Sequence, residues 1–343
     1  MEKQVEDGIL GQLQTDLIKA WRPFHSDVLE CWRQLPNKAF FLILLAAWLA
    51  LFHFLGNSTM GYYRSPSLLG WMYNAYNQQT ATGASDEAHG NFIPFLVLGL
   101  FVWKRKQLLA LPLKTWSPGL AIVGLGLLLH VVGYVVQQPR ISIIGMFSGI
   151  YGLMGLAWGP AWLRTSFFPF FLFAACVPLG SLALPITFRL QSLVSRLVEL
   201  VGNFVLGIGI VREGNLLMDS RGSFQYEVAA ACSGIRSLIA ISVIATIYAF
   251  VAFRGPGKRL LLIASAVPLA VLGNLFRMLF IVIAADMGGQ TWGSKVHDSF
   301  VFSLVPYIPA IVGLLLLGRF LEGRERREAK GLSAESLDPK AEG

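Results

Sequence analysis

The chain has 343 residues, of which 55% are hydrophobic and only 14% are charged. Soluble domains carry about 25% charged residues, so this composition indicates a protein embedded in a lipid bilayer. The formal net charge of +8 comes from lysines and arginines scattered among short loops. Because they form no continuous basic stripe, we expect no nucleic-acid partner.

The N-terminal residues Met1–Lys38 are polar and of mixed charge, unlike a cleaved signal peptide, and predict a cytoplasmic extension. The three cysteines are too few for a disulfide framework and show no CxxC spacing, and no ligand cluster suggests a metal site. We therefore expect neither a metal nor a cofactor. Cys31 and Cys176 look structural, which leaves Cys232 as the one reactive candidate.

The apolar runs predict an all-α polytopic membrane protein, because about 20 apolar residues cross a bilayer as a helix. A transmembrane domain over residues 39–320 is followed by a basic, disordered cytoplasmic tail over residues 321–343. The fourth span is rich in glycine, which favours close helix packing. About eight spans are expected: Ala39–Leu55, Phe92–Trp103, Pro118–Val136, Ile141–Trp158, Phe167–Ile186, Ile235–Phe253, Leu260–Ala285 and Phe300–Phe320.

Two segments between the fifth and sixth spans differ from the rest. In Thr187–Val205, apolar residues recur at helical spacing with polar residues between them, which predicts an amphipathic helix lying along the membrane interface. Gly207–Glu227 carries turn signals at Gly214-Asn215 and Arg221-Gly222, which predict a short β-like hairpin. Such irregular backbone cannot face lipid, so it lies in water or against protein.

Lysines and arginines beside the spans predict the orientation in the membrane, because cytoplasmic loops carry the excess of positive charge. With eight spans the most basic loops fall on one side, and both termini lie with them in the cytoplasm. The opposite side receives Gly56–Asn91, the amphipathic helix, Cys232 and the loop Asp286–His297. Four arginines on that outer side go against the rule: Arg189, Arg196, Arg212 and Arg221.

Three reactive side chains converge on the outer side in this topology. Cys232 stands between the alternating, strand-like Phe224–Val228 and the sixth span, where a helix N-terminus stabilises a thiolate. Arg277 lies within the seventh span, on the same helix face as Asn274, and His297 lies at the outer entry to the eighth. A thiol nucleophile, an imidazole and a guanidinium together suit acyl transfer at a peptide bond.

Further residues have both supporting and non-catalytic interpretations. Arg236, one turn after the cysteine, is an alternative charge partner, and Glu227 either orients groups near the thiol or faces water. His89 lies in a polar outer loop, where it either lines an acceptor site or ties the loop down. A cysteine in an apolar chain is usually inert, and Arg277 can instead be bound to carbonyls or to Asp286.

The run Val228–Leu238, which reads VAAACSGIRSL, resembles the signature of the exosortase/archaeosortase family of membrane cysteine transpeptidases. The resemblance covers roughly Ala88 to Phe320, and Val301 stands where the family often has a glycine four residues after its histidine. Further blocks agree in order: Ala88–Pro94 with Trp103–Arg105, Gly214-Asn215, Pro268–Ala270 with Asn274–Arg277, and His297 at the place of the family's histidine motif.

The resemblance implies a sorting enzyme of the bacterial inner membrane that is active on its periplasmic face. Its substrates would be membrane-anchored proteins with a C-terminal tripartite signal: a short motif such as Pro-Glu-Pro (the PEP-CTERM type), a transmembrane helix and a basic cluster. Cys232 would form a thioester, His297 would manage the protons and Arg277 the developing charge. An amine or hydroxyl acceptor, or water, would then release the protein.

Two other functions remain open. A membrane thiol protease would hydrolyse the same tail and transfer nothing. A non-enzymatic transporter would use Arg277 in a substrate path, although no inverted repeat supports it. Cys232→Ser separates an enzyme from a transporter, and an acceptor joined to the released C-terminus separates transfer from hydrolysis.

Overall fold

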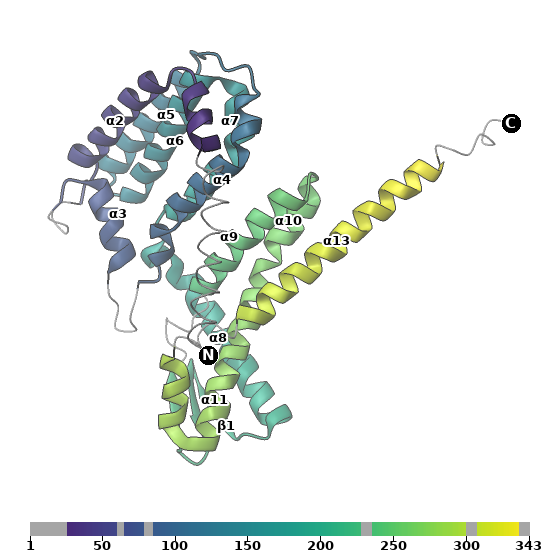
Figure 1. Ribbon diagram of the computed structural model, residues 1–343. Coiled ribbons are helices and arrows are strands. Elements are labelled where there is room, and N and C mark those ends of the chain that lie inside the picture. The colour runs from purple at the N-terminus through teal and green to yellow at the C-terminus, as the bar shows by residue number, and fades with distance from the viewer. Residues whose placement is uncertain (1–25, 60–64, 79–84, 228–234, 300–306, 336–343) are drawn as a thin grey trace, which may run out of the picture. The chain divides into compact units, whose positions relative to one another are not determined.

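The computed structural model describes residues 26–59, 65–78, 85–227, 235–299 and 307–335. These residues are mostly helical, with one small sheet (Figure 1). The chain divides into two compact units: Met1–Asn74 with Gly90–Pro178, called unit 1, and Ala75–His89 with Leu179–Gly343, called unit 2. Each unit is described by itself below.

The N-terminal half of the chain is helical, and its helices pack through glycine. A Cβ atom on Gly126 would lie 2.6 Å from the carbonyl oxygen of Gly145 and 2.8 Å from the nitrogen of Gly149. The backbones of α5 and α6 therefore touch, which confirms the close packing expected of the glycine-rich segment. The elements are a helix over residues 26–34, α2 (Lys38–Leu55), α3 (Leu68–Asn77), η1 (Ala88–Asn91), α4 (Ile93–Leu109), α5 (Gly119–Val135), α6 (Pro139–Trp158), α7 (Pro160–Phe171) and η2 (Leu172–Cys176).

Unit 2 combines helices with an antiparallel sheet in the order β1-β2-β3. The register pairs Val211 with Met218 and Leu217 with Tyr226. The sheet therefore begins where the turn signals predicted a hairpin, and a third strand adds to it. The elements are η3 (Gly180–Ala183), α8 (Leu184–Val201), the π-helical turn η4 (Gly202–Leu206), β1 (Ile210–Glu213), β2 (Leu216–Asp219), β3 (Gln225–Glu227), α9 (Ile235–Ala252), α10 (Pro256–Ala264), α11 (Ala266–Asp298) and α13 (Tyr307–Glu335).

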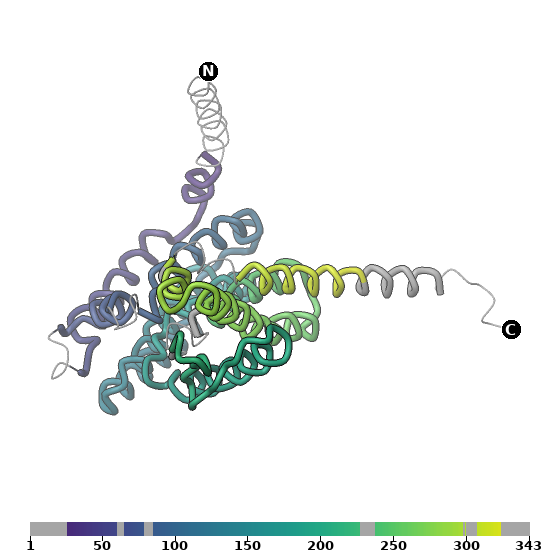
Figure 2. Tube along the Cα trace, turned by 90° about the horizontal axis from the view of Figure 1, so that it is seen from below, coloured from purple at the N-terminus to yellow at the C-terminus, as the bar shows by residue number. Residues whose placement is uncertain are grey.

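Two apolar cores hold unit 2 together. In the first, called the sheet core, α8 and α11 pack with the strands, and Figure 2 gives α8 (teal-green) and α11 (yellow-green) from a second direction. In the second, α9, α10, α11 and α13 pack against one another around Ala266 and Ala270. α11 belongs to both cores. The buried members of the sheet core are Val194, Val198, Ile208, Ile210, Leu217, Phe224, Tyr226, Met278, Ile281, Val282 and Ala285.

Both edges of the sheet are closed by a side-chain amide. On β1, the N–H of Ile210 donates to Asn203 Oδ1 (2.8 Å) and Asn203 Nδ2 donates to the oxygen of Ile210 (2.9 Å). On β3, the N–H of Gln225 donates to Gln290 Oε1 (2.9 Å) and Gln290 Nε2 donates to the oxygen of Gln225 (3.0 Å). Each amide thus pairs with an edge residue as a neighbouring strand would. We call these two contacts the amide brackets.

The described helices suit a membrane, and the eight-span arrangement stays a prediction. Among the described residues, three helices are long and apolar enough to cross a bilayer, or four if one bent pair counts as a single span. The three are Lys38–Leu55, Pro139–Trp158 and Pro256–His297, the bent pair is Pro160–Cys176 with Gly180–Leu206, and two shorter apolar helices are Gly119–Val135 and Ser237–Ala252.

The structure also corrects three local expectations. The expected fifth span, Phe167–Ile186, is interrupted, and α8 starts anew at Leu184 because Pro185 suits the first turn of a helix. The segment Gly56–Asn91, expected as a loop, contains the helix α3. The loop expected over Asp286–His297 is instead the helical end of α11.

A candidate thiol-transferase site at the α11 hairpin

α11 folds back on itself at two glycines. Gly288 has φ −135° and ψ 18°, and Gly289 has φ 69° and ψ −174°, a left-handed φ that favours glycine. A Cβ atom on Gly293 would lie 2.9 Å from the Cβ of Ala285. Residues eight apart in a straight helix are separated by about 12 Å along the axis, so the two arms must lie side by side (Figure 1). We call residues 266–287 the first arm and residues 290–298 the second arm.

This hairpin brings His297 back towards Arg277. The two arms run antiparallel, so a step of one residue towards the C-terminus on the second arm is matched by a step of one residue towards the N-terminus on the first arm. The contact described above therefore puts His297 level with Ile281, one helical turn from Arg277; in a straight helix the two would be about 30 Å apart. Val296 packs on the sheet core, as this register requires, and both Arg277 and His297 are partly buried.

β3 is fastened to the second arm of the hairpin. The hydroxyl of Tyr226 donates a hydrogen bond to the carbonyl oxygen of Gln290 (2.7 Å). A Cβ atom on Gly293 would overlap the Tyr226 hydroxyl, so only a glycine lets the tyrosine approach this closely. Phe224 and Tyr226 are buried and Gln225 is exposed, which confirms the alternation read from the sequence. The strand that precedes the predicted nucleophile is thus joined to the arm that carries His297.

Cys232 lies outside the described residues, so its predicted position at a helix N-terminus stays a prediction. β3 ends at Glu227 and α9 begins at Ile235, with Arg236 in its first turn.

Asn274 is buried on the first arm, three residues before Arg277. It lines a cavity of about 10 Å³ together with Leu190 and Val194 of α8 and Leu238 of α9. A cavity of this size holds one water molecule at most, so it is a packing gap rather than a substrate pocket. The amphipathic helix α8 therefore lies directly beside the first arm.

His89 lies beside Glu87 in a loop before α4. Its Nε2 lies 4.0 Å from Glu87 Oε2, and Glu87 Oε1 accepts the backbone N–H of Gly180 at 2.8 Å. These contacts tie η1 to the turn before α8. The bond to Gly180 is made by Glu87, and the role of His89 itself stays a prediction.

Two larger cavities are lined by residues on the second arm or by a cysteine. A polar hollow of about 650 Å³ is lined by Gln290, Thr291, Ser294, Lys295 and Ser299. At 100° per residue, Gln290 and Ser294 lie within about 60° of His297 around the second arm, so one rim of this hollow is on the same side of the arm as that histidine.

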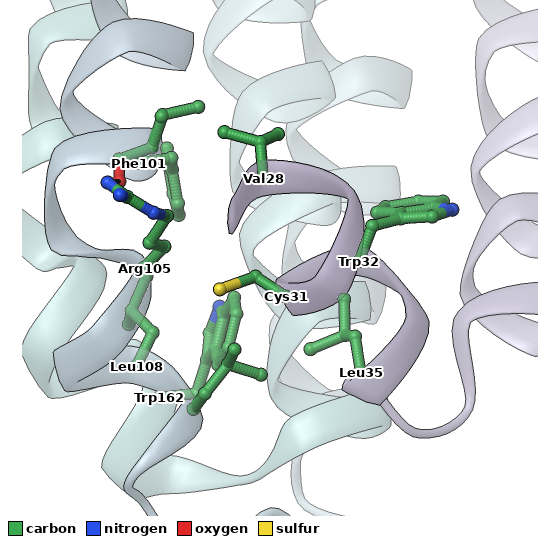
Figure 3. A pocket seen from close by; sticks show the side chains of 10 residues that line it. Val28, Cys31, Trp32, Leu35, Phe101, Arg105, Leu108 and Trp162 are labelled. Carbon is green, nitrogen blue, oxygen red and sulfur yellow. Dashed lines mark hydrogen bonds between the residues drawn. The ribbon is translucent and has the colours of Figure 1, made fainter. Parts of the chain in front are cut away.

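An apolar pocket of about 160 Å³ lies in unit 1, between the helix over residues 26–34, α4 and α7. Figure 3 shows Cys31 pointing into this pocket beside Trp162. The thiol packs there as a small apolar group, in keeping with the structural role expected of Cys31. Within the described residues no group of three or more His, Cys, Asp or Glu is arranged to hold a metal ion.

Sequence reasoning missed the residues that build the hairpin. Gly288-Gly289 is a turn signal inside an otherwise helical pattern and marks the place of the reversal, but not the packing of the two arms. Gln290 and Tyr226 carried no such signal, because an amide among polar residues and a tyrosine in a strand are both ordinary.

One comparison with known proteins identifies a family for this chain. Residues 79–318 match the family model described as transmembrane exosortase (Exosortase_EpsH), which covers more than half of the chain and includes Cys232 and the α11 hairpin. No curated protein and no solved structure matches the chain. The chain belongs to the transmembrane exosortases, a family of membrane protein-sorting enzymes.

Proposed function

We propose that this exosortase cleaves the C-terminal sorting signal of membrane-anchored proteins with Cys232 as nucleophile, and transfers the new C-terminus to an acceptor. The α11 hairpin is the observation that carries the proposal. Arg277 and His297 are one helical turn apart in register on its two arms, and β3, which leads into Cys232, is packed against it. A thiol, an imidazole and a guanidinium are the groups that thioester chemistry needs.

The reaction proceeds in two steps. The sulfur of Cys232 attacks the carbonyl carbon at the signal, and the peptide C–N bond breaks as the C–S bond of a thioester forms. His297 takes the thiol proton and gives it to the leaving amine, while Arg277 stabilises the negative oxygen of the tetrahedral intermediate. An amine or hydroxyl acceptor, or water, then attacks the thioester, and the thiol recovers a proton through His297.

The membrane supplies much of the substrate binding. Because the substrate carries its own transmembrane helix, its scissile bond is held at the interface and meets the enzyme in two dimensions. This confinement raises the effective concentration without a deep pocket. We propose that the site faces the periplasm at the inner membrane, with the amphipathic α8 as one wall because it lies beside the first arm.

The test is co-expression with a protein that carries a candidate tail, read out by mass spectrometry of that protein. Cys232→Ala, Arg277→Ala and His297→Ala should each leave the tail intact at normal expression. Matched controls are Cys31→Ala, in the apolar pocket, and the exposed Arg164→Ala, both of which should process the tail as wild type does.

An added mass at the new C-terminus identifies transfer, and a free carboxylate identifies the hydrolysing thiol protease. Processing by Cys232→Ala would refute the thiol mechanism. If all three variants behave as the controls do, the chain does not use this trio at all.

A further inference from the structure

We infer that Gln290 and Tyr226 are positioning residues, which fix the second arm of the α11 hairpin against β3 and thereby set His297 relative to Cys232. This inference rests on the proposed function. Neither side chain needs to touch the substrate. Gln290 acts through the amide bracket on Gln225 and Tyr226 acts through the carbonyl oxygen of Gln290.

The second arm depends on tertiary contacts because it is short. It has nine residues, from 290 to 298, and follows two glycines whose backbone is not helical. An isolated helix of that length is unstable in water, so tertiary contacts must maintain it. Tyr226, Gly293 and Val296 pack it against the sheet core from one side, and the amide bracket fixes its first residue.

The geometry shows why a contact at Gln290 matters at His297. The two residues are seven positions apart, or about 10 Å along the helix. A tilt of about 10° at the first residue of the arm moves its last turn by about 2 Å. Misplacing a reacting group by about 1 Å can lower a rate by about 100-fold, so small changes at the bracket should reach the chemistry.

The opposite edge of the sheet offers a matched control. Asn203 brackets Ile210 on β1 with the same two hydrogen bonds, but it belongs to the turn η4 after α8 and has no part in the hairpin. Asn203→Ala and Gln290→Ala therefore remove the same bonds from the same sheet. Only Gln290→Ala releases the arm that carries His297.

The experiment compares tail processing and Cys232 alkylation in full-length protein purified in detergent. For Gln290→Ala and Tyr226→Phe we expect kcat to fall about 10- to 100-fold with KM changed less than about twofold. At pH 7, peptide-level mass spectrometry should show slower alkylation of Cys232 by iodoacetamide, because a displaced imidazole stabilises the thiolate less. Asn203→Ala should change neither quantity by more than about twofold.

The double variant Gln290→Ala/His297→Ala completes the test. If Gln290 acts through His297, Gln290→Ala should slow alkylation in the wild-type background but have no effect in the His297→Ala background. The effects of the two substitutions are then not additive. Equal losses in Gln290→Ala and Asn203→Ala would overturn the inference and leave the bracket a purely structural contact. Unchanged or faster alkylation in Gln290→Ala would overturn it as well, since loosening alone exposes the thiol. Activity in Cys232→Ala would instead refute the proposed function itself.

Discussion

Gly293→Ala should open the α11 hairpin, although alanine is the better helix former. The new Cβ would overlap the Tyr226 hydroxyl and lie 2.8 Å from the ring carbon Cζ and 2.9 Å from the Cβ of Ala285. Overpacking of this kind costs about 1–3 kcal/mol, whereas replacing glycine by alanine within a helix gains at most about 1 kcal/mol. The overlap therefore wins, and the net loss of stability should be about 1–2 kcal/mol.

Thermal unfolding in detergent and tail processing measure this effect. Gly99→Ala is the matched control, because a Cβ there meets no atom within 4 Å in a helix interior, and it should be neutral or slightly stabilising. Adding Tyr226→Phe should recover part of the thermal stability that Gly293→Ala loses, since it removes the overlapping hydroxyl but keeps the ring; it should not restore tail processing. If the Gly293→Ala variant is as stable and as active as the Gly99→Ala variant, the close approach of Tyr226 to the second arm is refuted.

Two further predictions test a helix contact in unit 1 and an ion pair in unit 2. Gly126→Ala should lower the melting temperature in detergent, because its Cβ would meet the backbone of α6 at a cost of about 1–3 kcal/mol. Gly124→Ala is the control, since a Cβ there meets no atom within 4 Å, and it should not lower the melting temperature. Equal melting temperatures for the two variants would contradict the contact. Glu199→Gln removes the 3.0 Å ion pair with Arg212. In a double-mutant cycle, the coupling energy between the two side chains should be less than about 1 kcal/mol and should shrink at high salt. A coupling energy that salt leaves unchanged would argue against a surface pair.

Much of the fold follows from local pattern. The alternation around Tyr226 predicted a strand, and the apolar periodicity of Thr187–Val205 predicted a helix that the structure has over Leu184–Val201. Glycines at Gly145 and Gly149 predicted close helix contact because only a missing side chain lets two backbones meet. Each of these features depends on residues that are near one another in the sequence.

The hairpin of α11 depends on contacts that local pattern does not contain. The polar segment after Ala285 has the composition of a loop, and its helical conformation is maintained by β3, which lies some 60 residues earlier in the chain. Sequence reasoning therefore found Arg277 and His297 as candidates but assigned His297 to the wrong kind of segment. The role of the trio itself stays a prediction, as does the position of Cys232.

The two amide brackets have a consequence for how the sheet meets other chains. An edge strand with free N–H and C=O groups is a template for strand addition and for aggregation. Here Asn203 and Gln290 occupy both groups of Ile210 and Gln225, so an incoming extended segment would first have to displace an amide at either rim. Within a crowded membrane, these two side chains therefore hinder strand pairing at one residue on each edge of the sheet.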